Sequence, residues 1–109
     1  VSYPGLPSLE GHELAAKQMS GFGGMLSFEI KGGRAAGAKL LDSLQMCSTA
    51  VSLGDAETLL EHPASMTHSP YTAEELEAAG ISEGLVRVSV GLENVEDIIA
   101  DLAQAFEQI

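Results

Sequence analysis

Alternating hydrophobic and polar positions predict short β-strands along this chain. Leu26, Phe28 and Ile30 share one side of an extended segment, with Ser27 and Glu29 on the other. The stretches predicted to be strands are residues 25–30, 48–54 and 85–90. Residues 56–71 contain two prolines and no clear period, so we expect a short extended piece followed by a loop there.

Hydrophobic residues three and four positions apart predict helices between these strands. The predicted helices are residues 9–19, 34–46, 72–79 and 95–109. Thr72 and Glu75 have the spacing of a capping box, and Asn94 is a suitable cap for the last helix. The last helix has the strongest apolar stripe, formed by Val95, Ile98, Ile99, Leu102, Phe106 and Ile109. Strands alternating with covering helices predict a two-layer α/β sandwich.

Length and charge narrow the range of functions. The 109 residues suit one domain, and no apolar run is long enough to cross a bilayer. The net charge of −11 argues against nucleic acid and against an anionic membrane surface as partners. The single cysteine, Cys47, cannot form an internal disulfide, so we expect a cytoplasmic protein.

The charges are unevenly distributed, and this singles out Arg87. Residues 54–109 contain twelve acidic residues and one basic residue, Arg87, which lies within a predicted apolar strand. A guanidinium in that position must be paired, and its planar fork matches a carboxylate. The partner is either an internal acid or the carboxylate of a ligand. The internal candidates are Glu57, Glu61 and Glu93.

Other candidate chemistry is weaker. The segment GGRAAGAK (residues 32–39) resembles a phosphate loop, but Ala38 stands where the lysine should be, so a tight strand-to-helix turn is expected. His62, His68 and Cys47 match no metal-ligand spacing. None of the lysines at 17, 31 and 39 has the pattern of a desolvated amine that could form a Schiff base.

Several segments in order resemble one enzyme family. The motifs SLG (52–54), HPASMTH (62–68) and GLVRVSVGLE (84–93) are similar to those in the C-terminal domain of the cysteine and methionine metabolism enzymes that use pyridoxal phosphate. The similarity covers essentially the whole chain. Together with the turn-rich start VSYPGLPS and the absence of an initiator methionine, it leads us to expect a piece of a longer protein.

The resemblance implies a fold, a division into domains and a set of binding residues. The implied fold is a small, mostly antiparallel sheet of three to four strands with helices on one face. Residues 1–8 would be a linker from a missing large domain, and residues 9–109 the C-terminal substrate-binding domain. Arg87, Ser52 and, more weakly, Thr67 would bind the substrate carboxylate. The missing domain would hold pyridoxal phosphate and the catalytic residues, which leaves no catalytic, cofactor-binding or metal-binding residue here.

The resemblance also implies an activity and an assembly. Pyridoxal phosphate would act as an electron sink while Arg87 orients the amino acid, without taking part in proton transfer. The full-length enzyme would be a homotetrameric carbon–sulfur lyase acting on methionine. Within the family, the alternatives are enzymes that process cystathionine or O-acetylhomoserine. Outside it, the alternative is a non-catalytic α/β module that binds amino acids.

Overall fold

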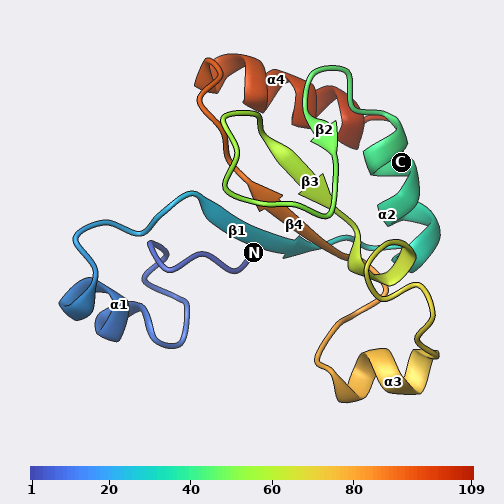
Figure 1. Cartoon of the computed structure of the whole chain (residues 1–109), viewed down its shortest axis with the longest axis horizontal. Coiled ribbons are helices and arrows are strands. Elements are labelled where there is room, and N and C mark those ends of the chain that lie inside the picture. Colours follow the sequence, from blue (N-terminus) through green and yellow to red (C-terminus); the bar gives the residue numbers. More distant parts are fainter.

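The computed structural model describes all 109 residues, arranged as a four-stranded sheet with helices (Figure 1). The helices are α1 (His12–Gln18), α2 (Gly33–Asp42), α3 (Ala73–Ala78) and α4 (Val95–Phe106), with a 3-10 turn, η1, at Pro63–Ser65. The strands are β1 (Met25–Glu29), β2 (Ser48–Thr49), β3 (Leu59–Glu61) and β4 (Leu85–Ser89). None of the helices has the length and apolar character needed to span a membrane.

The sheet and its helices form the predicted two layers. The strand order is β1-β4-β3-β2; the β1–β4 and β4–β3 pairs are antiparallel and the β3–β2 pair is parallel. Helices α2 and α4 lie on the same side of the sheet (Figure 1). The core between the layers consists of Leu40, Leu41, Cys47, Leu60, Val86, Val88, Ile98 and Ala105. The predicted fold class is therefore confirmed.

The strand register places a polar row on the opposite face of the sheet, which we call the outer face. Arg87 in β4 is paired with Ser27 in β1 and with Glu61 in β3. Directly paired residues project to the same side of a sheet, and the neighbouring pair Leu60–Val88 projects into the core. Ser27, Glu61 and Arg87 therefore lie side by side on the face away from α2 and α4.

Two predicted elements end earlier than their patterns indicated. The helix predicted over 34–46 ends at Asp42, because the amides of Gln45, Met46 and Cys47 donate to Asp101 of α4 instead of to helical carbonyls. The strand predicted over 48–54 keeps only Ser48–Thr49. Beyond it the chain leaves the sheet, and two of its carbonyls accept hydrogen bonds from Arg87.

The apolar stripe of the last helix is wider than the surface it covers. Ile98 is buried, whereas Val95, Ile99, Phe106 and Ile109 are 60%, 54%, 41% and 44% exposed. Only part of the predicted apolar stripe is therefore buried within this chain. In the capping box of α3, the side chain of Thr72 accepts from the amide of Glu75 and the side chain of Glu75 accepts from the amide of Thr72, as predicted.

Candidate functional site

Arg87 is held on the outer face by two of its three nitrogens. Nη1 lies 2.9 Å from Oε2 of Glu61. Nη2 donates to the carbonyls of Val51 and Ser52, at 3.0 and 2.9 Å. Nε is buried and has no hydrogen-bond partner. A guanidinium carries five N–H donors, so this arrangement leaves part of its donor capacity unused.

Glu61 is the internal acid that pairs with Arg87. It lies directly opposite Arg87 in the β3–β4 ladder, and its side chain is only 3% exposed, against 26% for Arg87. Glu93 instead accepts from the amide and the hydroxyl of Thr58, and these hydrogen bonds lower the pKa of Glu93. Glu57 is exposed and faces Ser48. Of the three acids considered from the sequence, only Glu61 reaches the guanidinium.

The other two predicted binding residues lie next to this pair. Thr67 donates its hydroxyl hydrogen bond to Oε1 of Glu61, and the same hydroxyl lies 2.8 Å from Nδ1 of His68. Ser52 contacts Arg87 through its backbone carbonyl, and its side chain is exposed. The structure thus brings Arg87, Ser52 and Thr67 together, with Glu61 as the link between Arg87 and Thr67.

A small cavity opens beside Arg87. It has a volume of about 190 Å³ and is lined by Arg87 with Ser2, Met25, Leu26 and Ser27. Ser2 borders it because its backbone pairs with Ser27 through two hydrogen bonds, of 2.7 and 3.0 Å. The predicted linker, residues 1–8, therefore contacts the sheet at this point.

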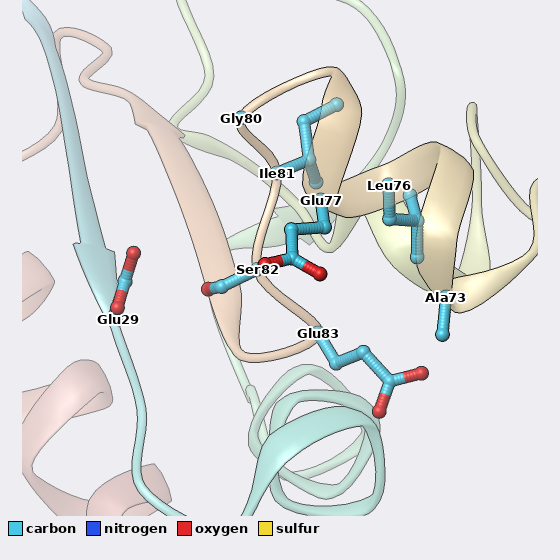
Figure 2. A pocket seen from close by; sticks show the side chains of 8 residues that line it. All are labelled: Glu29, Ala73, Leu76, Glu77, Gly80, Ile81, Ser82 and Glu83. Atoms are coloured by element: carbon cyan, nitrogen blue, oxygen red, sulfur yellow. The ribbon is translucent and has the colours of Figure 1, made fainter.

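The remaining cavities lack a cation. Figure 2 shows one of about 340 Å³ next to α3, with the carboxylates of Glu77 and Glu83 and the hydroxyl of Ser82 among its lining groups. Another, of about 440 Å³, lies against α4 and contains Asp97 and Asp101. Neither is lined by a cation that could pair with a carboxylate ligand, so the Arg87 cavity is the one whose charge suits an acidic group.

The other sequence candidates have structural roles. His62 is fully buried; its Nε2 donates to the carbonyl of Glu83, and its Nδ1 lies 2.7 Å from the hydroxyl of Ser65. Burial, reinforced by Asp101, raises the pKa of the Cys47 thiol to about 12, which disfavours the reactive thiolate. No group of three or more His, Cys, Asp or Glu side chains is arranged to hold a metal ion.

The lysines do not form a site for an aldehyde cofactor. Lys17, Lys31 and Lys39 are all exposed, and none of them lines a cavity. A lysine that forms a Schiff base is normally desolvated or lies next to another cation. The residues of this chain therefore do not fit pyridoxal phosphate, whereas the guanidinium of Arg87 fits a carboxylate.

Glu61 is the residue of this cluster that sequence reasoning did not assign to a binding site. From the sequence it is only one of three possible ion-pair partners of Arg87. A signal was present in the segment TLLEHP, where Glu61 follows two leucines in an apolar context much as Arg87 does in its own strand. Two opposite charges in two apolar strands indicate that the strands are neighbours.

The chain matches a known enzyme family over nearly its whole length. The model of the family described as Cys/Met metabolism PLP-dependent enzyme matches residues 1–107. The L-methionine gamma-lyase of Fusobacterium nucleatum subsp. polymorphum is 70% identical over 109 residues, which are 100% of this chain and 28% of that protein. The L-methionine gamma-lyase of Porphyromonas gingivalis is 64% identical, over 100% of this chain and 27% of that protein.

A solved structure shows the same fold. The cystathionine gamma synthase of Xanthomonas oryzae pv. oryzae, in complex with aminoacrylate and cysteine, superposes with a TM-score of 0.87 at 50% identity. The match covers 97% of this chain and 27% of that one. The chain thus spans little more than a quarter of the length of the proteins that it matches.

Proposed function

The chain belongs to the family of Cys/Met metabolism PLP-dependent enzymes, and from this membership we propose that the full-length protein is an L-methionine gamma-lyase. Its reaction would convert methionine and water to methanethiol, 2-oxobutyrate and ammonia. Residues 9–109 would be the C-terminal substrate-binding domain, and residues 1–8 the linker from a large domain. Pyridoxal phosphate and the catalytic residues would lie in that large domain.

The observation that carries the proposal is the guanidinium of Arg87. It is the one cation that lines a cavity of this chain. On the outer face it is paired with Glu61, and its Nε has no hydrogen-bond partner. In the proposed enzyme it binds the α-carboxylate of the amino acid. Fixing that carboxylate restricts how the rest of the substrate lies, which is how binding contributes to the rate. Ser52 and Thr67 complete the carboxylate site.

The test is the kinetics of the full-length enzyme with Arg87 replaced. Arg87→Ala should lower kcat/KM for L-methionine, measured as 2-oxobutyrate formed. The loss should correspond to about 2–5 kcal/mol of transition-state stabilisation. Arg87→Lys should fail as well, because an ammonium cannot reproduce the planar fork. Since Arg87→Ala leaves Glu61 buried without its partner, the double variant Arg87→Ala/Glu61→Ala serves as the stability control. Unchanged kinetics in Arg87→Lys would exclude the carboxylate site.

A second candidate within the family is a cystathionine gamma-synthase, cystathionine gamma-lyase or sulfhydrylase. The likeness to the Xanthomonas cystathionine gamma synthase, at 50% identity, supports this alternative. The higher identity to methionine gamma-lyases, 70% and 64%, favours the first proposal. Assaying the full-length enzyme with methionine, cystathionine and O-acetylhomoserine side by side distinguishes them.

We further propose that the full-length protein is a cytoplasmic homotetramer. Cell fractionation tests the location, and light scattering tests the assembly.

A further inference from the structure

We propose that Glu61 is a positioning residue, which holds the Arg87 guanidinium in the orientation that receives the substrate carboxylate. The inference rests on the proposed function, because it presupposes that Arg87 binds a carboxylate. Glu61 lies outside the motifs SLG, HPASMTH and GLVRVSVGLE, which carry the family resemblance.

Glu61 fixes the guanidinium from one side while the loop after β2 fixes it from another. Oε2 of Glu61 pairs with Nη1 at 2.9 Å, and the carbonyls of Val51 and Ser52 accept hydrogen bonds from Nη2 at 3.0 and 2.9 Å. Acceptors on both terminal nitrogens determine the plane of a guanidinium and its rotation within that plane. Arg87 is therefore oriented before any ligand arrives.

Glu61 is itself held at both oxygens. While Oε2 takes Arg87, Oε1 accepts the hydroxyl of Thr67, and the side chain is almost fully buried at 3% exposure. The carboxylate consequently has little freedom to rotate. The hydrogen bond from Thr67 to Glu61 and the ion pair from Glu61 to Arg87 therefore fix the guanidinium relative to the backbone of β3 and the following loop.

The placement of the pair is explained better by orientation than by stability. A buried ion pair is often no more stabilising than apolar residues of the same size, and neighbouring positions of β3 and β4 are filled by Leu60, Val86 and Val88. Holding a flexible arginine in advance moves its loss of rotamer freedom from the binding step to folding. An ion pair that leaves Nε without a partner also leaves the guanidinium incompletely satisfied.

Position and charge can be separated by two variants of the full-length enzyme. Glu61→Gln keeps the length of the side chain: its carbonyl can accept from Arg87, while its amide donates to Thr67. Glu61→Asp keeps the charge but withdraws the carboxylate by one methylene. If Glu61 acts by position, Glu61→Asp should raise KM for L-methionine at least about tenfold with kcat changed less, whereas Glu61→Gln should stay within about threefold.

A binding measurement without turnover supplies a readout that a structural role would not change. The probes are L-norleucine and n-pentylamine, which differ only in the α-carboxylate. Each is titrated into the full-length enzyme with pyridoxal phosphate bound, and its Kd is measured by calorimetry. The preference for norleucine is the ratio of the Kd of pentylamine to the Kd of norleucine. In Glu61→Asp this ratio should fall at least about tenfold, and in Glu61→Gln it should be retained. General loosening of the fold would weaken the binding of both ligands alike and leave the ratio of their Kd values unchanged.

The outcomes separate this inference from the proposed function. If Glu61→Asp leaves both KM and the norleucine preference unchanged while Arg87→Lys lowers the preference, the positioning role is wrong and the carboxylate site stands. If Glu61→Gln is impaired as much as Glu61→Asp, keeping the length of the side chain does not preserve binding, so position alone is not what matters and the inference is also overturned. If Arg87→Lys too leaves the preference unchanged, it is the proposed function that fails.

Discussion

At the scale of single residues, Gly37 and His62 show how a missing side chain determines the packing between α2 and the loop after β3. A Cβ at residue 37 would lie 2.4 Å from Nε2 and 2.6 Å from Cδ2 of His62. The imidazole cannot move aside easily, because it is fully buried and both its nitrogens are hydrogen-bonded, to Ser65 and to Glu83. Helix α2 can therefore approach this histidine only where it carries a glycine.

This packing predicts that Gly37→Ala destabilises the protein by about 1–3 kcal/mol, although alanine is the better helix former by about 1 kcal/mol. Gly21→Ala is the matched control, since a Cβ there has no heavy atom within 4 Å and its φ is ordinary. Thermal unfolding of the full-length protein measures both. Equal midpoints for the two variants would show that His62 can be displaced without cost.

The candidate site could be predicted from the sequence only in part. Arg87 is recognisable because one positive charge in an apolar strand must have a partner. The choice among Glu57, Glu61 and Glu93 could not be made, since it depends on the strand register and on the competing hydrogen bonds of Glu93 with Thr58. The contribution of Ser52 through its carbonyl depends on a loop conformation that no periodic pattern encodes.

At the scale of elements, Asp101 joins α4 to the segment that follows α2. Its carboxylate accepts the amides of Gln45, Met46 and Cys47 at 2.8, 2.9 and 2.7 Å. Burial alone would raise its pKa, but these bonds, with the side chain of Gln104, outweigh burial and lower the pKa of Asp101 from 3.8 to about 2. The ionised form is thus favoured by folding.

The sign of this shift gives a pH-dependent prediction. Because the folded pKa lies below the unfolded one, the stabilisation is complete above 3.8 and is lost as the pH falls through about 2. Asp101→Asn should therefore destabilise the protein by about 2 kcal/mol at neutral pH, and by much less at about pH 2.5. Unfolding midpoints at the two pH values test this. Asp97→Asn, an exposed change in the first turn of the same helix, is the control.

Element types were predictable where a local pattern sufficed, and boundaries were not where a distant residue intervened. The capping box at Thr72 and Glu75 is local, and the helix that it predicts is present. The end of α2 is set by Asp101, more than fifty positions away, so the helical pattern extended too far. Leu59–Glu61 is too short to show a period, yet it forms the strand that carries Glu61.

At the scale of the whole molecule, the two faces of the sheet differ in how they are covered. Helices α2 and α4 bury one face, whereas the outer face carries the ion pair of Glu61 and Arg87. Large apolar side chains also stay exposed at the loops beside that pair, at 54% for Val51 and 57% for Leu53. Exposed apolar surface of this kind often marks a contact site, and we propose that the remainder of the full-length protein covers it.

The proposed division of labour predicts where the cofactor attaches. The three lysines of this chain are exposed and line no cavity, so none should capture an aldehyde selectively. After incubation with one equivalent of pyridoxal phosphate and borohydride reduction, the 109-residue chain should show only scattered, substoichiometric labels by peptide mapping. The full-length protein, treated in the same way, should show one stoichiometric label on a lysine outside this chain. A full equivalent on Lys17, Lys31 or Lys39 would instead place cofactor chemistry here, and Arg87 would then have to be reconsidered as its neighbour.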